Sequence, residues 1–189
     1  MLDGGGTLYD NIAYESIQRR RAQRRVRNGL TLHDYVPFMF APRSPMLFTI
    51  NNGNVEGCNL KQDEIVHLFA HAQNVADSKL EFEFSNYHAV MDYAQFFNSL
   101  DQLSEIDWEL ILEGPALGGY CRYWNNRPLE RYMKRKETRQ AEFLVRDKFP
   151  ISLIRGIGVA SQAIAQEVEN SMKSCGWNVP VVARPQWYY

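Results

Sequence analysis

One charged side chain interrupts an apolar stretch of the chain, "RQAEFLV" at residues 139–145. Phe143, Leu144 and Val145 are typical of a buried strand, and Ala141 is compatible with one. Glu142 is the exception, because a carboxylate beside such residues has to find water or a polar partner. A fold of this chain must therefore bury the strand and still provide for Glu142.

The size and composition indicate one soluble domain over residues 1–189. Of these 189 residues, 45% are hydrophobic and 23% are charged, with a net charge of −1, and a domain of this length buries roughly 70% of its unfolded surface. No segment has the ~18 apolar residues of a membrane span. The first residues lack the pattern of a signal peptide, and three scattered cysteines favour a reducing compartment, so we expect a cytoplasmic protein.

Helix and strand patterns are mixed without regular alternation, which predicts an α+β fold: a mixed sheet core with flanking helices. Asp10 and Asn28-Gly29 would bound a helix, Ser44 would cap a second helix, and Pro37 would place its strand at a sheet edge. The predicted helices cover residues 11–27, 45–52, 88–103, 107–114 and 161–174. The predicted strands cover residues 34–40, 63–71, 79–84, 139–145, 153–161 and 179–184, and residues 114–128 form a long loop rich in glycine and proline.

Two motifs that resemble binding sites are rejected. "GIGVAS", at residues 156–161, has Ser161 in place of the third glycine of a dinucleotide fingerprint, and too few residues follow it. Its glycines are better explained by close packing in a strand. His67 and His71 are four residues apart, but in a strand this spacing separates them by roughly 13 Å. We therefore expect no metal site.

An arginine-rich segment, "RRRAQRRVR" at residues 19–27, lies in the first predicted helix. On a helical wheel, Arg21 continues the apolar stripe of Ala13, Tyr14 and Ile17, whereas Arg19 falls on the far side. An inward-pointing arginine needs an anion, either a carboxylate or a phosphate. The alternative is an arginine whose stem packs while its guanidinium reaches solvent. The sequence alone leaves both possibilities open.

Several segments together resemble one family. They are "IAYESIQRRRAQRRV", "GLTLHDYVPFMFAPRSPMLFTI", "NYHAV", "LDQLSEIDW", "RQAEFLV" and the terminal "WYY". Their order and spacing are similar to those of DarT-type toxins, which are bacterial ADP-ribosyltransferases that modify thymidine in single-stranded DNA. The resemblance implies a small ADP-ribosyltransferase fold, NAD as co-substrate, no metal, and single-stranded DNA as the acceptor. It also implies a macrodomain-containing antitoxin as partner; we expect a monomer that does not bind membranes.

The resemblance assigns roles to individual residues. Glu142 matches the family's catalytic glutamate, whose carboxylate would face positive charge on the ribose as the nicotinamide bond breaks. Arg21 matches a second essential residue, which would hold the NAD phosphates and polarise a thymine carbonyl, and His88 matches a histidine near the substrate. Arg21, Ile17 and Tyr14 belong to the helix that would cover NAD.

The DNA contacts implied by the resemblance come from His88, Met46, Arg43 and Met39, through base stacking and phosphate contact. Met39 departs from the pattern because an aromatic residue is expected there. The family also begins with a strand carrying a histidine, and roughly 30 residues of that region have no counterpart here. Two alternatives to the transferase remain. Without the first strand, the protein could be a catalytically impaired DNA-binding relic of the toxin. With water as the acceptor, it would be an NAD glycohydrolase.

Overall fold

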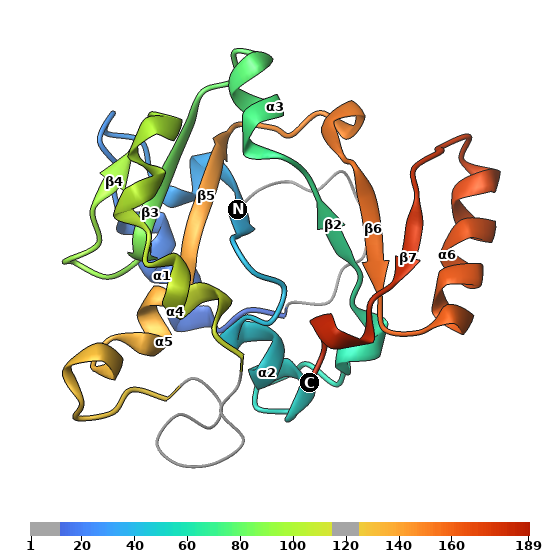
Figure 1. Ribbon diagram of the computed structural model, residues 1–189, viewed down its shortest axis with the longest axis horizontal. Helices are drawn as coiled ribbons and strands as arrows, with labels where there is room; N and C mark the ends of the chain where they lie inside the picture. The colour runs from blue at the N-terminus through green and yellow to red at the C-terminus, as the bar shows by residue number, and fades with distance from the viewer. Residues whose placement is uncertain (1–11, 115–124) are drawn as a thin grey trace.

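The computed structural model describes residues 12–114 and 125–189, and its strands form two sheets (Figure 1). The strands are β1 (Tyr35–Met39), β2 (His67–Phe69), β3 (Phe82–His88), β4 (Phe96–Phe97), β5 (Ala141–Arg146), β6 (Gly156–Val159) and β7 (Val181–Ala183). The helices are α1 (Glu15–Gln23), α2 (Pro45–Asn51), α3 (Ala72–Asp77), α4 (Trp108–Leu112), α5 (Arg135–Thr138) and α6 (Gln162–Ser174).

The first sheet has four antiparallel strands in the order β1-β5-β3-β4, and β5 is the predicted apolar strand. Ala141 to Val145 are all buried, as expected for a strand with neighbours on both sides. Phe143 stacks on Phe82 and Phe84, with ring centroids 4.9 and 6.3 Å away. β1 lies at the edge of the sheet, where Pro37 disrupts no ladder on its open side, so this prediction is confirmed.

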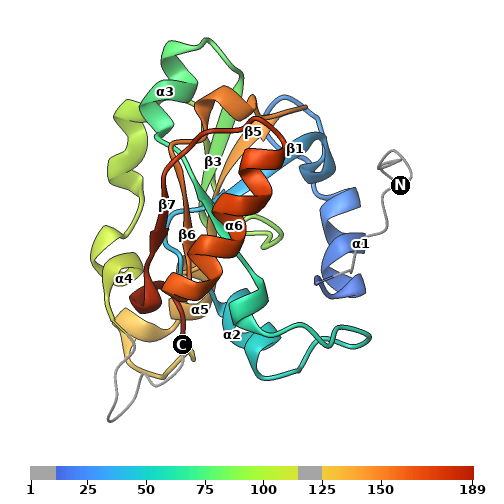
Figure 2. The same cartoon turned by 90° about the vertical axis from the view of Figure 1, so that its right-hand side faces the viewer.

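The second sheet has the order β2-β6-β7, in which β6 pairs antiparallel with β2 and parallel with β7. Helix α6 connects β6 to β7 and packs along this sheet (Figure 2). A Cβ atom at Gly156 would lie 2.4 Å from the Phe69 ring, and one at Gly158 would lie 2.2 Å from the Trp187 ring. These glycines therefore allow aromatic rings to lie directly on the strand, as the packing interpretation of "GIGVAS" predicted.

Helix caps follow local sequence signals. The hydroxyl of Ser44 accepts a hydrogen bond from the Leu47 amide, and Pro45 occupies the first turn of α2. The hydroxyl of Ser161 likewise accepts from the amide of Ile164 at the start of α6. Both helices were predicted with nearly these bounds, because a capping hydroxyl is a local signal.

The predicted helix over residues 88–103 is wrong. His88 ends β3, a turn follows, and Phe96 and Phe97 form β4 by pairing with Ser85 and Phe84. A 3-10 segment, Leu100–Glu105, continues the chain. The apolar residues do recur at helical spacing, but pairing with β3 and aromatic packing in the core decide their conformation.

Helix α1 is also shorter than predicted, since it ends at Gln23 and Arg25 pairs with Thr31 in an isolated bridge. Its expected cap, Asp10, lies outside the described residues, as do residues 115–124 of the predicted long loop. The short helices α3 and α5 were not predicted. Across residues 12–114 and 125–189, every helix is too short or too polar to span a membrane.

Candidate active site

Glu142 lies near the start of the central strand β5, and its side chain is fully buried. On one side it pairs with Met39 of β1. On the other side the register of β3 shifts between Phe84 and His88, so the backbone bulges beside Glu142. The Glu142 amide donates a hydrogen bond to the hydroxyl of Ser85 within this bulge, at 3.2 Å. The bulge thus changes the direction of the β3 side chains next to the carboxylate.

The partner of the Glu142 carboxylate is Arg21. Arg21 Nη1 lies 2.7 Å from Glu142 Oε2, and the two side chains are 12% and 0% exposed. The other carboxylate oxygen, Oε1, accepts a hydrogen bond from the backbone amide of Ala89 at 3.3 Å. Both oxygens therefore have a donor, which is the condition for keeping a charged carboxylate inside a protein. Of the two possibilities that the sequence left open for Arg21, an anion partner or a guanidinium that reaches solvent, the structure shows the first, and the anion is a carboxylate.

His88 completes this group, because its Nε2 lies 3.8 Å from Glu142 Oε1. Burial lowers the pKa of His88 below its usual value, and the charges of Arg21 and Arg20 lower it further, while Glu142 and Glu137 act in the opposite direction. The ring is therefore neutral at pH 7, so one nitrogen can donate and the other can accept.

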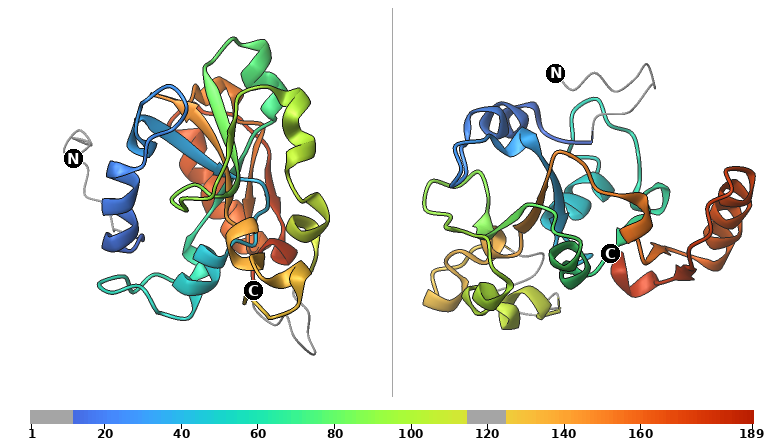
Figure 3. Two further views of the ribbon diagram at one scale, coloured as in Figure 1. Left: turned by 90° about the vertical axis from the view of Figure 1, so that its left-hand side faces the viewer. Right: turned by 90° about the horizontal axis from the view of Figure 1, so that it is seen from above.

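Helix α1 is fastened over the turn that follows β3 (Figure 3, left). Arg20 Nη2 donates to the carbonyl of Val90 at 2.8 Å, and Arg24 Nη2 donates to the carbonyls of Asp92 and Ala94 at 3.3 Å each. Arg19 instead points to solvent and pairs with Glu15 of its own helix. Arginines of one face of α1 thus hold the turn that supplies the Ala89 amide to Glu142.

The other candidate residues lie around this group at different positions. Ile17 packs against the buried cluster that contains Leu144, and Tyr14 is 44% exposed with its hydroxyl donating to the Asn54 carbonyl at 2.7 Å. Met46, in α2, is 38% exposed, and the carbonyl of Arg43 accepts a hydrogen bond from Arg139. Within the described residues, no hydrogen bond or ion pair joins Arg43 or Met46 to Arg21, His88 or Glu142.

Some contributors were not predicted from the sequence. The Ala89 amide is a backbone group and gives no side-chain signal. Ser85 stands in a strand beside aromatic residues, and its polar character could have marked the bulge. Arg135 is fully buried and pairs with Glu113, with Arg135 Nη2 3.0 Å from Glu113 Oε2. This pair joins α5 to the end of α4, just before β5.

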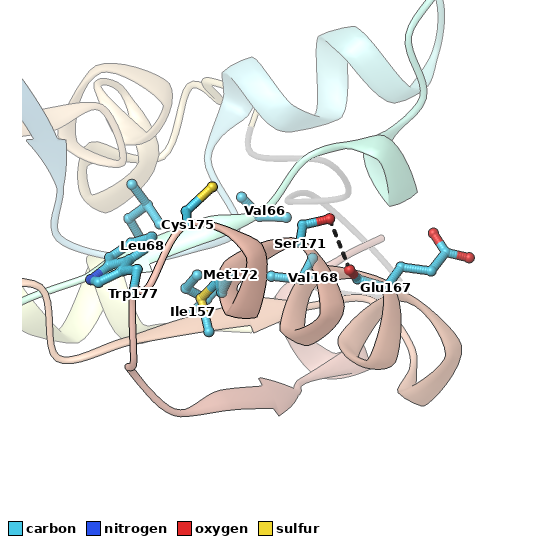
Figure 4. Close-up of a pocket in the computed structure, with 9 residues that line it drawn as sticks. All are labelled: Val66, Leu68, Ile157, Glu167, Val168, Ser171, Met172, Cys175 and Trp177. Atoms are coloured by element: carbon cyan, nitrogen blue, oxygen red, sulfur yellow. Dashed lines mark hydrogen bonds between the residues drawn. The ribbon is translucent and has the colours of Figure 1, made fainter.

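A cavity in the described part of the chain lies elsewhere, between the β2 edge of the second sheet and α6 (Figure 4). Its volume is about 430 Å³, and its walls are mainly apolar, with Leu68, Ile157, Met172 and Trp177 among them. It shares no residue with the Glu142 group. It has few polar atoms, so it offers little to a charged or highly polar substrate.

Among the described residues, no group of three or more histidine, cysteine, aspartate or glutamate side chains gathers closely enough to hold an ion. His67 packs against the rings of Trp187 and Tyr188, with centroids 5.8 and 4.9 Å away. Cys58 and Cys175 are free thiols.

A buried carboxylate on a central strand, paired with an arginine from an overlying helix, suits a transferase that stabilises positive charge on a sugar. A family model described as "ssDNA thymidine ADP-ribosyltransferase, DarT" matches residues 2–189. The chain belongs to the DarT family, so the resemblance drawn from its sequence is confirmed.

Relatives and solved structures agree with this assignment. A DNA ADP-ribosyl transferase of Thermus sp. (strain 2.9) is 40% identical over 187 residues, which cover 95% of this chain and 81% of that protein. A DNA ADP-ribosyl transferase of Escherichia coli O127:H6 is 33% identical over 169 residues, covering 87% of this chain and 71% of that protein.

The structure of Thermus sp. 2.9 DarT in complex with ADP-ribosylated ssDNA matches with a TM-score of 0.82 at 39% identity, covering 95% of this chain and 81% of that chain. The complex of the same protein with NAD+ matches with a TM-score of 0.79 at 36% identity, covering 97% and 87%. The predicted fold class is thereby confirmed.

Proposed function

We propose that this protein transfers ADP-ribose from NAD to thymidine in single-stranded DNA, and that Glu142 is the carboxylate at its reaction centre. The observation that carries the proposal is the fully buried Glu142 held by Arg21 at 2.7 Å, inside a chain of the DarT family. The Thermus relative has been solved with NAD+ and with ADP-ribosylated ssDNA, which supports the same pair of substrates here.

Glu142 stabilises the positive charge that develops on the ribose when its bond to nicotinamide breaks. The carboxylate is oriented before the reaction by Arg21 and by the amide of Ala89, so no side chain has to reorganise as the charge appears. Its burial among apolar side chains of β5 strengthens its field, because the local dielectric is lower than in water. This interaction is stronger in the transition state than in the ground state, which is what accelerates a reaction.

Arg21 has two roles in the proposed site. It holds the Glu142 carboxylate in place through a 2.7 Å hydrogen bond, and its remaining N–H groups are available to the NAD phosphates or to a thymine carbonyl. It does not act as a base, because a guanidinium stays protonated at physiological pH. A diphosphate fits this environment, since Arg20 of α1 and Arg24 at the C-cap of α1 add positive charge to that of Arg21.

The further candidate residues receive supporting roles. His88, neutral at pH 7, hydrogen-bonds the acceptor base beside Glu142. Tyr14 and Ile17 belong to the helix that covers NAD, and the helix-capping loop with Arg43, together with Met46, contacts the DNA strand. Met39 lies next to Glu142 in the sheet and packs against the acceptor base.

We further propose that the protein is the toxin of a toxin–antitoxin pair whose second member carries a macrodomain that removes ADP-ribose. The support is the DarT family assignment and a fold likeness to a Thermosipho africanus DarTG structure in complex with ADP-ribose, at 17% identity and a TM-score of 0.69.

Incubation with NAD and a short thymidine-containing single strand, followed by mass spectrometry, tests the transferase. We expect DNA heavier by one ADP-ribose, formed roughly 10²–10³-fold more slowly by Glu142→Gln, which removes the charge and keeps the shape. The matched control is Glu81→Gln, which removes an exposed carboxylate from the end of the same sheet. Near-full activity of Glu142→Gln would overturn the role of Glu142. Free ADP-ribose without modified DNA would indicate a glycohydrolase, and DNA binding without any product would indicate the relic.

A further inference from the structure

Two tyrosines and a lysine gather next to the Glu142 group. Tyr87 precedes His88 at the end of β3, Tyr93 lies in the turn before β4, and Lys134 immediately precedes α5. The two tyrosine rings meet edge to face, with centroids 5.3 Å apart and an interplanar angle of 80°. Lys134 Nζ lies 4.3 Å from the centre of the Tyr93 ring and 5.2 Å from that of the Tyr87 ring.

This cluster is accessible and carries a charge. Tyr93 is 41% exposed, and Lys134 is exposed as well. Within the part of the chain that the structure describes, Lys134 forms no ion pair, and its ammonium contacts only the two rings. Glu137 on α5 acts electrostatically on Tyr93, but its carboxylate accepts a hydrogen bond from the side chain of Asn126 at 2.7 Å.

The cluster is also held rigidly at the site. The turn that carries Tyr93 is fastened to α1 by Arg20 and Arg24. Tyr87 is adjacent to His88, which pairs with Ala141 in the sheet and lies 3.8 Å from Glu142. Glu137 acts electrostatically on both His88 and Tyr93, so the cluster lies beside the reaction centre.

We propose that Tyr87, Tyr93 and Lys134 form a platform for the nucleotide next to the target thymidine, a role that rests on the proposed function. Exposed aromatic faces stack on nucleic-acid bases without strong sequence preference, and a cation beside them attracts the backbone phosphate. The base stacks on Tyr93, Tyr87 supports that ring from its edge, and Lys134 faces the phosphate. If Lys134 only linked α5 to the turn, the Tyr93 ring would not need to be exposed. Its ammonium would then also not need to lack a carboxylate partner.

The test is the affinity for a short thymidine-containing single strand, measured by fluorescence anisotropy at several salt concentrations. We expect Tyr93→Ala to weaken binding between about 5-fold and 100-fold, the range for loss of one stacked base. Tyr93→Phe keeps the ring and should stay within about twofold of the wild type. Lys134→Gln should weaken binding and reduce the salt dependence by about 0.7 in the logarithmic slope, the value for one phosphate contact on a single strand.

Two controls make the result decisive. Lys136→Gln removes an exposed charge from the same helix and should leave the salt slope unchanged, and NAD affinity should be the same in all variants. Thermal unfolding reports whether Tyr93→Ala is folded, and Lys134→Gln tests the platform if it is not. Unchanged DNA affinity of folded Tyr93→Ala and Lys134→Gln would overturn the platform while leaving the transferase intact. Absence of DNA modification by the wild type would instead contradict the proposed function.

Discussion

The two sheets of this protein differ in what they bury: a charged pair in the first sheet and aromatic rings in the second. The first sheet buries a charged pair, Arg21 with Glu142, whose carboxylate also accepts a hydrogen bond from the Ala89 amide and lies 3.8 Å from His88. In the second sheet, aromatic rings pack directly against glycines of β6. The hydroxyl of Tyr188 donates a hydrogen bond to the Ile65 carbonyl at 2.7 Å. They stand at opposite ends of the molecule when it is seen from above (Figure 3, right).

The difference shows that the first sheet contains an interaction that adds little stability, whereas the packing of the second sheet is stabilising. A buried ion pair contributes little net stability, because desolvation offsets the attraction between the charges. Ring-on-glycine packing instead removes apolar surface from water at no electrostatic cost. We therefore expect substitutions in the first sheet to change catalysis strongly, and those in the second sheet to change stability alone.

The largest expected effect is that of Arg21→Ala. Its transfer rate should fall at least 10²-fold, and its free energy of unfolding by about 3 kcal/mol, because Glu142 is left buried without its cation. Arg19→Ala is the matched control, since Arg19 belongs to the same helix but its side chain is 71% exposed. The measurements are product formation by mass spectrometry and denaturant unfolding.

A double variant sharpens this prediction. Adding Glu142→Gln to Arg21→Ala should recover part of the lost stability and none of the activity, because the uncompensated charge is gone. If the double variant were as unstable as the sum of both single variants, the ion pair would not be the cause of the destabilisation.

The second effect is expected from Gly158→Ala. The new methyl group would overlap the Trp187 ring, and relieving the overlap should cost about 1–3 kcal/mol of stability. Gly114→Ala is the control, because a Cβ atom there has no neighbour within 4 Å among the described residues. Thermal unfolding measures the loss. The transfer rate per folded molecule should stay at the wild-type value, and a large fall in that rate would contradict the separation of the two sheets.

The smallest effect concerns one histidine of each sheet. Burial lowers the pKa of His67 and of His88 below the ordinary value of 6.5. The unfolded chain therefore binds more protons between the lowered values and 6.5, so this contribution to stability is complete above pH 6.5 and is lost as the pH falls through the folded values. NMR titration of the imidazole signals measures both values directly.

The same titration separates the two environments. Glu142→Gln should lower the pKa of His88 further, because the carboxylate that favours its charged form is gone. The pKa of His67 should not move, since burial is the cause of its shift. Equal movement of both signals would mean that the sheets are electrostatically coupled.

Much of the fold followed from local signals in the sequence. Apolar β-favouring residues marked β5, the capping serine Ser44 marked α2, and Pro37 marked an edge strand. The helix expected over residues 88–103 failed because its helical spacing was outweighed by pairing of Phe96 and Phe97 with β3. Short elements such as α5 gave no periodic signal over their four residues.

For the candidate active site, the sequence determined which residue types were out of place: a glutamate within an apolar strand and an arginine on an apolar helix face. Only the tertiary structure decided that these two residues meet, because they are 121 positions apart and no local pattern encodes such a distance. It also decided the bulge of β3 and the Ala89 amide, since backbone groups carry no residue-specific signal. A charged residue in an apolar segment can be recognised from that segment alone. The partner of its charge cannot, because the contact forms between segments that only folding brings together.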